Sequence, residues 1–189
     1  MTRIPSSSHP LGGLLLTCAL LLSACGGPTP ATPAPDRPGR QDGGPAPTAA
    51  EARMLEAVNA ARATARKCQG RDFPAAPALT WNGLLGQAAR AHAQDMAARD
   101  YFDHVSPEGV DLKARVEKAG YAGWRTLGEN IAAGFSDSQI PEVMAGWLGS
   151  KTGHCEALMN PEFTEVGFGY APSTGGKYSA YWVQDFGSR

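Results

Sequence analysis

The chain has 189 residues and is close to electrical neutrality, with 17 Lys and Arg against 18 Asp and Glu. It has no basic excess and no cluster of Lys and Arg, which argues against nucleic acid as a partner. The stretch from Thr48 to Arg189 is long enough for one domain with its own hydrophobic core.

The N-terminus has the pattern of a secretory signal. Arg3 is followed by an apolar run from Leu11 to Leu22, which is shorter than the roughly 20 residues of a membrane-spanning helix. The run ends in LSAC, which resembles the lipobox of bacterial lipoproteins. We therefore expect residues 1–24 to be a lipoprotein signal peptide and Cys25 to be lipidated, so that the membrane is a partner and the domain is exported to the cell envelope. An ordinary signal peptide cleaved at the same place is the alternative.

A Pro- and Gly-rich segment follows the predicted lipidation site. Residues 26–47 read GGPTPATPAPDRPGRQDGGPAP and contain no aromatic residue and no Val, Ile or Leu. Such a segment has nothing to bury, so we expect residues 25–47 to form a disordered tether. The tether would hold a domain at residues 48–189 away from the membrane surface.

Two cysteines, Cys68 and Cys155, lie in the predicted domain. Thiols of exported proteins are commonly oxidised, so we predict a disulfide between them. It would close a loop over 87 positions, from 155 − 68. The alternative is a nucleophilic Cys155 activated by a histidine.

Four segments have the apolar spacing of amphipathic helices. The first begins at a capping box formed by Thr48 and Glu51 and fades near Lys67. The second begins at Asn82, and its apolar face includes His92. A lone histidine on such a face is more often a core or interface side chain than a ligand, so we give His92 no chemical role.

The later part of the domain changes from a helical to a strand-like pattern. A third helix is predicted from Asp111 to Gly120, and a fourth over 140–148, with Gly153 just beyond its end. Alternating residues over 166–170 and a β-rich run over 181–183 predict an antiparallel hairpin, joined by the turn-rich APSTGGK. Helices first and strands late indicate the α+β class.

Three side chains are candidates for chemistry: His104 in FDHVSPEG, Glu129 in GEN and His154 in GHC. Two imidazoles and a carboxylate can bind a transition metal and leave a position open for water, or they can act as a proton-transfer set. Their spacing alone does not say that they converge. Signatures of zinc peptidases, serine hydrolases and phosphate-binding loops are absent from the sequence.

Short motifs run through the domain in a characteristic order. They are WNxxL and AxxHAxxM over 81–96, FDHVSPEG over 102–109, GY at 120–121, GENIAAG over 128–134, WLGSKTGH over 147–154, NPEFTEVGFGYA over 160–171 and YWVQDFG over 181–187. Together they resemble bacterial members of the CAP superfamily (SCP-like domains), which comprises cysteine-rich secretory proteins, antigen 5 and pathogenesis-related proteins. The resemblance implies a CAP-type α-β-α sandwich with a central antiparallel sheet.

The resemblance also implies a central cleft lined by two histidines and two glutamates, which in some members binds zinc or another divalent ion. By motif, His104, Glu129 and His154 match three of these four residues. The position of the second glutamate is occupied by Ser150, and the sequence does not place the nearby Glu156 in the cleft. We therefore expect a divalent metal, zinc being the best candidate, at His104, His154 and Glu129, and no other cofactor.

These observations favour a lipid-anchored, extracytoplasmic binding module without catalytic activity, whose ligand or envelope partner the sequence does not name. The first alternative is a metal-assisted hydrolase or peptidase, in which His104 and His154 hold the metal and Glu129 is the general base. The missing carboxylate at Ser150 argues against it. The second alternative is a purely structural envelope protein, in which Glu129 only fixes a loop through hydrogen bonds.

Overall fold

The computed structural model describes residues 43–189. The predicted signal peptide, the predicted lipidation site Cys25 and most of the predicted tether lie outside these residues. Among residues 43–189, no helix is long and apolar enough to cross a membrane.

The last residues of the predicted tether contact the domain. Trp81 Nε1 donates a hydrogen bond to the carbonyl of Pro45 (3.1 Å), and Arg90 Nη2 donates one to the carbonyl of Ala46 (2.9 Å). Ordered contacts therefore begin a few residues before Thr48, the first residue of the predicted domain.

The centre of the domain is a four-stranded sheet in the order β3-β5-β6-β4. Its strands are β3 (Thr80–Trp81), β4 (Thr126–Ala133), β5 (Glu165–Pro172) and β6 (Ala180–Ser188). Strands β5 and β6 form the predicted antiparallel hairpin, and β4 pairs antiparallel with β6. The short β3 runs parallel to β5, so the sheet is mostly, not wholly, antiparallel. Strand β4 is an edge strand, which matters for the site.

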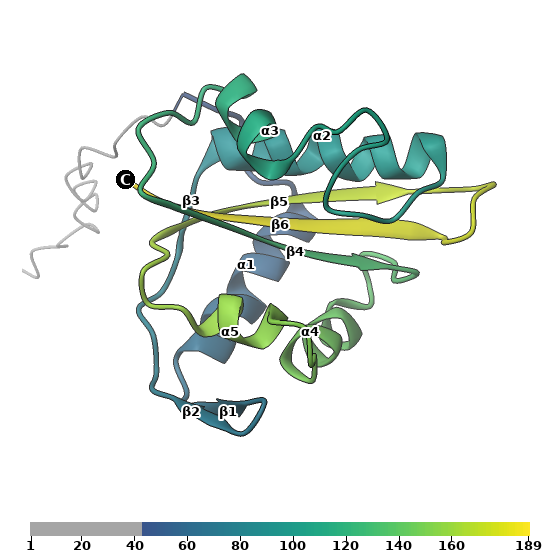
Figure 1. The fold of residues 1–189 in the computed structure, drawn as a ribbon. Helices are drawn as coiled ribbons and strands as arrows, with labels where there is room; N and C mark the ends of the chain where they lie inside the picture. The colour runs from purple at the N-terminus through teal and green to yellow at the C-terminus, as the bar shows by residue number, and fades with distance from the viewer. Residues whose placement is uncertain (1–42) are drawn as a thin grey trace, which may run out of the picture. The chain divides into compact units, whose positions relative to one another are not determined.

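Helices cover both faces of this sheet (Figure 1). On one face lie α2 (Gly83–Arg99) and α3 (Leu112–Lys118), and on the other lie α1 (Ala49–Arg62), α4 (Ile140–Leu148) and α5 (His154–Met159). The largest core cluster packs Met54, Trp147 and Leu158 against Phe168 and Trp182 of the sheet. The α+β class and the α-β-α sandwich are therefore confirmed. A separate hairpin is formed by β1 (Arg66–Cys68) and β2 (Arg71–Phe73).

The two glycines of the VGFGY motif explain how closely α2 lies on the sheet. A Cβ atom on Gly167 would lie 2.0 Å from the backbone N of Gly86, and one on Gly169 would lie 2.3 Å from the backbone C of Ala89. Any side chain at these positions would push α2 away from β5. The alternation in this motif therefore places large residues toward one helical layer and bare backbone toward the other.

The predicted helix starts are confirmed. Thr48 and Glu51 form the capping box of α1, Asn82 accepts hydrogen bonds from the first turn of α2, and Asp111 caps α3. His92 is buried on the inner face of α2, as expected. These starts depend on local hydrogen bonds, which is why the sequence indicates them well.

The short strands β1, β2 and β3 were not predicted, and two larger differences concern α5 and β4. The fourth helix ends at Leu148, where Gly149 is the C-cap, and Gly153 instead precedes α5 in the left-handed region with a φ of 94°. Helix α5 has only 6 residues, too few to show an apolar period. Strand β4 was also not predicted, because its centre contains the polar pair Glu129 and Asn130.

The predicted disulfide is confirmed. Cys68 and Cys155 are joined, with their Cα atoms 5.5 Å apart. Both are buried in a small cluster with Met159. The bond links the β1–β2 hairpin to α5, and an oxidised Cys155 is not a nucleophile, so the alternative interpretation is wrong for this state.

Candidate binding site at the edge of strand β4

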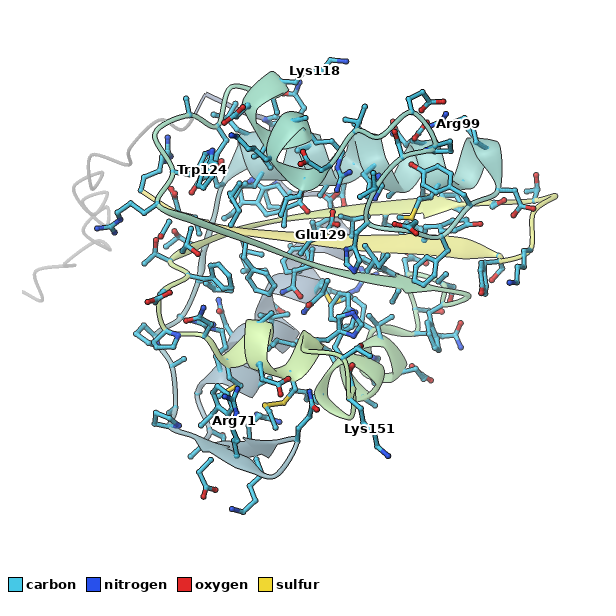
Figure 2. All side chains as sticks on the ribbon, in the orientation of Figure 1. Arg71, Arg99, Lys118, Trp124, Glu129 and Lys151 are labelled. Carbon is cyan, nitrogen blue, oxygen red and sulfur yellow. A yellow bond between two sulfur atoms is a disulfide. The ribbon has the colours of Figure 1, made fainter. Side chains whose placement is uncertain are left out.

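Glu129 is the central residue of the candidate site. It projects from β4, and Figure 2 shows it on the sheet, between the two helical layers. Its Oε1 lies 2.7 Å from Nδ1 of His104, and its Oε2 accepts a hydrogen bond from Nη2 of Arg115 at 2.6 Å. The Glu129 side chain is 3% exposed, whereas that of His104 is 49% exposed. A buried carboxylate therefore joins a surface imidazole to a buried guanidinium.

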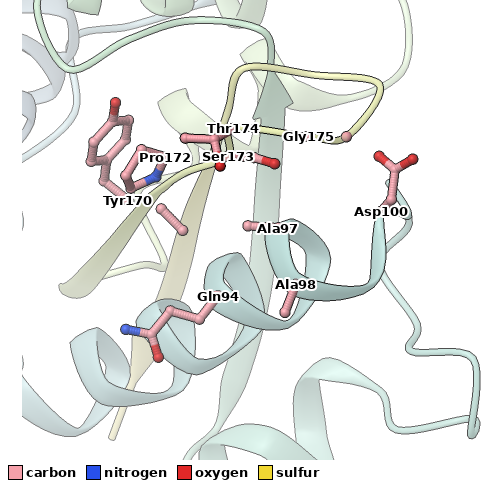
Figure 3. A pocket seen from close by; sticks show the side chains of 11 residues that line it. Gln94, Ala97, Ala98, Asp100, Tyr170, Pro172, Ser173, Thr174 and Gly175 are labelled. Atoms are coloured by element: carbon pink, nitrogen blue, oxygen red, sulfur yellow. The ribbon is translucent and has the colours of Figure 1, made fainter.

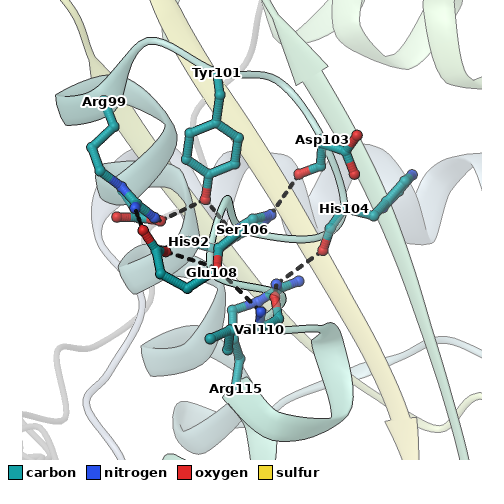
Figure 4. A network of polar contacts seen from close by, with 10 residues as sticks. His92, Arg99, Tyr101, Asp103, His104, Ser106, Glu108, Val110 and Arg115 are labelled. Carbon is teal, nitrogen blue, oxygen red and sulfur yellow. Dashed lines mark hydrogen bonds and ion pairs between the residues drawn. The ribbon is translucent and has the colours of Figure 1, made fainter.

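The loop between α2 and α3 presents His104 at the surface, and buried groups fix this loop (Figure 4). His92 Nε2 lies 3.0 Å from the carbonyl of Asp103. Arg115 Nη1 donates to the carbonyls of His104 and Val110, each at 3.0 Å. His92 thus holds the site loop from α2, and Arg115 holds it from α3, so the backbone around His104 is anchored on both sides.

The electrostatics of this group follow from its contacts. Burial alone raises the pKa of Glu129, but the hydrogen bond from His104 and the charge of Arg115 outweigh it, and the pKa lies below its usual value. The same hydrogen bond raises the pKa of His104. Asp185, opposite Glu129 on β6, is fully buried, and burial together with the charge of Glu129 raises its pKa well above the usual value. Glu129 is thus the ionised member of this carboxyl pair.

His154 reaches the same edge from the other helical layer. It is the first residue of α5, and its carbonyl accepts a hydrogen bond from Nδ2 of Asn130 on β4 at 3.2 Å. Burial and then the charge of His104 lower the pKa of His154. The charge of His104 therefore influences the protonation of His154.

Ser150, which occupies the position of the family's second glutamate, and the nearby Glu156 have different surroundings. Ser150 Oγ lies 2.9 Å from Thr152 Oγ1 and accepts a hydrogen bond from Thr152 N at 3.1 Å, so it stabilises a turn. Glu156 has one buried carboxylate oxygen without a hydrogen-bond partner in the described part of the chain. Its charge opposes the lowering of the pKa of His154, which places it near that imidazole.

The described residues fit a metal only in part. Within residues 43–189, no group of three or more His, Cys, Asp or Glu side chains is arranged to hold a metal ion. Both oxygens of Glu129 already accept strong hydrogen bonds, so this residue is placed to orient His104 rather than to bind a metal directly. The donors that fit a divalent ion are the imidazoles of His104 and His154, with Glu129 as the carboxylate behind the first. The predicted metal remains a prediction.

The nearby cavities do not enclose these residues. One of about 390 Å³ adjoins the site and is lined by His92 and Arg115, but not by His104, Glu129 or His154. Another, of about 500 Å³, lies between the end of α2 and the β5–β6 turn (Figure 3). Its Asp100 carboxylate already accepts a hydrogen bond from Lys177 N at 2.6 Å. The candidate site is therefore a surface site at the sheet edge.

In the metal-free protein we expect the two imidazoles to titrate on opposite sides of the usual value of about 6.5. The pKa of His104 is higher in the folded protein than in the unfolded chain. Its contribution to stability is therefore complete below its pKa in the unfolded chain and is lost as the pH rises through its pKa in the folded protein. The pKa of His154 is lowered, so its contribution is present above the unfolded pKa and is lost as the pH falls through the folded pKa. Imidazole carbon–proton NMR spectra recorded against pH measure both values.

Glu129→Gln is the informative variant for this titration, because it keeps the shape and removes the charge. The pKa of His104 should fall toward its usual value and that of His154 should rise, since His104 would then be neutral over more of the range. Unchanged values in the variant would contradict the contact between Glu129 and His104.

Comparison with known proteins identifies relatives for most of the described chain. The model of the cysteine-rich secretory protein family, CAP, matches residues 55–186. Two Bacillus subtilis proteins without an assigned function are similar to this chain. YkwD is 37% identical over 102 residues, which are 54% of this chain and 36% of that protein. YlbC, described as a membrane protein, is 38% identical over 91 residues, which are 48% of this chain and 25% of that protein. The chain thus spans about a third or less of the length of each.

Solved structures with the same architecture include two bacterial surface or secreted proteins. An extracellular protein with an SCP domain from Bacillus anthracis superposes with a TM-score of 0.58 and 27% identity, over 74% of this chain and 40% of that one. An outer surface protein from Borrelia burgdorferi gives a TM-score of 0.56 and 22% identity, over 72% of this chain and 93% of that one. The second likeness concerns the fold alone.

Proposed function

Because the chain belongs to the cysteine-rich secretory protein (CAP) family, we propose that it is a lipid-anchored extracytoplasmic binding module without catalytic activity. Its ligand site is the surface formed by His104 and His154 at the edge of β4. A divalent cation, zinc in particular, is the ligand that the two imidazoles favour.

One observation carries this proposal: the contact between Glu129 and Nδ1 of His104 at 2.7 Å. An ionised carboxylate only accepts hydrogen bonds, so it holds the proton on Nδ1. In the neutral ring of His104 the free lone pair then lies on Nε2. The side chain of His104 is half exposed. A buried carboxylate behind a histidine is the usual way in which proteins orient an imidazole for a metal.

The same contacts argue against the hydrolase alternative. A general base must be able to reach a water molecule and take its proton. Both oxygens of Glu129 are occupied, its side chain is 3% exposed, and its lowered pKa makes it a weak base. The position of a second carboxylate is Ser150, whose hydroxyl is bound to Thr152.

We test the proposed site by calorimetric titration of zinc into the full chain carrying Cys18→Ser and Cys25→Ser, so that no free thiol competes for the metal. We expect micromolar or tighter binding that is lost in His104→Ala and in His154→Ala. Glu129→Gln should weaken binding about 10- to 100-fold, as expected for a carboxylate that orients a ligand. Ser150→Ala is the matched control and should bind like the parent.

The absence of zinc binding in the parent chain would contradict the metal site. Binding that survives in His154→Ala would show that the two imidazoles do not act together. Hydrolysis of peptides or esters by the parent, abolished by His104→Ala, would overturn the non-catalytic proposal and restore the hydrolase alternative.

Membrane anchoring is supported by the LSAC sequence that ends at Cys25 and by the disulfide, which suits an oxidising compartment. In a bacterial host that processes lipoproteins, we expect the chain to sediment with membranes and Cys25→Ser to abolish lipid attachment, as measured by mass spectrometry of the mature N-terminus. An unmodified N-terminus at Cys25 in the parent would contradict anchoring and favour an ordinary signal peptide.

A further inference from the structure

The outer edge of strand β4 carries main-chain groups that point away from the rest of the sheet. In an antiparallel pair, alternate residues bond to the neighbouring strand, and the residues between them direct their N–H and C=O groups to the other side. Gly134 N donates to the carbonyl of Ala180 at 2.9 Å, and this pair continues the register of β4 with β6. Even-numbered residues of β4 therefore bond to β6, and the odd-numbered residues from Leu127 to Ala133 point outward.

One part of this edge is covered and another part is open. The outward carbonyl of Ile131 accepts a hydrogen bond from Trp147 Nε1 at 3.1 Å, and Ile131 is buried. The outward main-chain groups of Leu127 and Glu129 have no hydrogen-bond partner within residues 43–189. The Glu129 side chain is 3% exposed, yet the residue as a whole is not buried, so its exposed atoms belong to the main chain. The open edge therefore runs from Leu127 to Glu129.

A pocket of about 450 Å³ lies beside the start of the open edge. Its apolar walls are Leu112 of α3, Trp124 and Leu127, all of them partly buried. Figure 2 shows Trp124 to one side of Glu129, toward the start of β4. Leu127 thus has two roles, because its side chain lines the pocket and its main chain points outward along the edge.

We propose that the open edge of β4 binds an extended peptide segment of a partner protein, which joins the sheet as a further strand. The outward groups of Leu127 and Glu129 recur at every second residue, about 6.6–6.8 Å apart, and another extended chain repeats its donors and acceptors at the same spacing. Side chains that lie opposite each other on neighbouring strands share one face of the sheet. The peptide residue opposite Leu127 therefore places an apolar side chain in the pocket.

Other occupants fit this edge less well. A lipid chain has neither donors nor acceptors and would leave the outward main-chain groups without partners. The segment 26–42 of this chain reads GGPTPATPAPDRPGRQD, in which Pro recurs every two or three residues. Because Pro has no N–H to donate, that segment is a poor strand. The edge and its pocket together select a partner segment with free amides and an apolar side chain.

The test is an NMR titration, in EDTA, of the isotope-labelled full chain carrying Cys18→Ser and Cys25→Ser with the peptide acetyl-TVLVT-amide. Two N-methylated forms are the matched probes, one methylated at the first, third and fifth amides and the other at the second and fourth. Alternate amides of a strand face opposite edges. One form should therefore bind like the parent peptide and the other at least about tenfold more weakly, because each lost hydrogen bond weakens binding by up to about tenfold.

Leu127→Pro tests the same contact from the side of the protein. It removes the outward N–H of Leu127, which takes no part in the pairing of β4 with β6, and an edge strand accepts Pro at such a position. Leu127→Ala is the matched control, because it also loses the leucine side chain but keeps the N–H. Leu127→Pro should bind the peptide about three- to tenfold more weakly than Leu127→Ala.

Several results would overturn the proposal. These are the absence of saturable shifts near β4 and α3, equal affinities of the two methylated peptides, and equal binding by the two folded Leu127 variants. Self-association of the chain that blocks peptide binding would also overturn it and assign the edge to a second copy. If Leu127→Pro does not fold, the two methylated peptides still decide the question. Because EDTA removes metal ions, zinc binding at His104 and His154 can fail or succeed without affecting this result.

Discussion

Replacing Cys68 and Cys155 together with alanine is expected to lower the free energy of unfolding by about 4–5 kcal/mol. The bond closes a loop over 87 positions, and the chain entropy that it removes from the unfolded state grows with the logarithm of that length. Equilibrium unfolding in urea, with and without the replacement, measures the difference. A loss below about 1 kcal/mol would contradict this account of the bond.

The disulfide should also affect the candidate site, because it holds the helix that carries His154. Helix α5 has 6 residues, and a helix of that length is not stable by itself. Its position depends on Cys155, on the buried side chains of Leu158 and Met159, and on the contact of Asn130 with the carbonyl of His154. We therefore expect the alanine pair to weaken zinc binding even under conditions in which the protein is still folded.

The adjacent residues His154 and Cys155 thus have separate roles that the sequence allowed us to distinguish. An even pair of cysteines in a predicted exported domain indicated the disulfide, and the family motif indicated the histidine. On α5 the cysteine is buried against Met159 and bonded to Cys68, whereas the histidine is only half buried. Consecutive residues on a helix point in different directions, which makes the two roles compatible.

Helix starts and the C-terminal hairpin could be predicted because their signals are local. Strand β4 could not, because an edge strand with Glu129 and Asn130 at its centre shows no apolar alternation. Its stability comes from pairing with β6, which is more than 50 residues away in the chain, as the register of Glu129 with Asp185 shows. Pairing over that distance cannot be recognised from the residue pattern of a short stretch of sequence.

The candidate site could be predicted only through the family resemblance, and its chemistry only in part. The spacing of His104 and Glu129 gives no reason to expect their contact. Arg115 belongs to a predicted helix, yet nothing in that pattern indicates that its guanidinium occupies one oxygen of Glu129. Both oxygens of Glu129 are thus engaged by protein side chains, an arrangement that the spacing of the residues does not indicate.

Arg62 is a second residue whose importance the sequence does not show. It lies in the last turn of α1, and its side chain is fully buried. Its nitrogens donate to four carbonyls: Pro77 at 2.8 Å, Leu158 at 2.6 Å, Asn160 at 3.1 Å and Phe163 at 3.3 Å. Burial lowers the pKa of this guanidinium, and its hydrogen bonds all go to backbone. One side chain therefore joins α1 to the loop before β3, to the C-terminal end of α5 and to the loop that follows α5.

We expect Arg62→Met to lower the free energy of unfolding by about 3–5 kcal/mol. Methionine fills much of the volume, but four carbonyls lose a charged donor, and each buried acceptor left without a partner costs about 1–3 kcal/mol unless water reaches it. Arg62→Lys should cost less, because one ammonium can still reach some of the carbonyls. Urea unfolding of the three proteins gives the comparison.

Arg53→Met is the matched control, since Arg53 lies on the same helix and is about half exposed. It should change stability by about 0.5 kcal/mol or less.

Because Arg62 binds the carbonyls of Leu158 and Asn160, it supports the C-terminal end of α5, while the disulfide supports its N-terminal half. Two supports of one short helix should not act independently, so combining Arg62→Met with the alanine pair should cost less than the sum of the separate losses. If the two losses in the free energy of unfolding were strictly additive, α5 would be held mainly by its packing on the core.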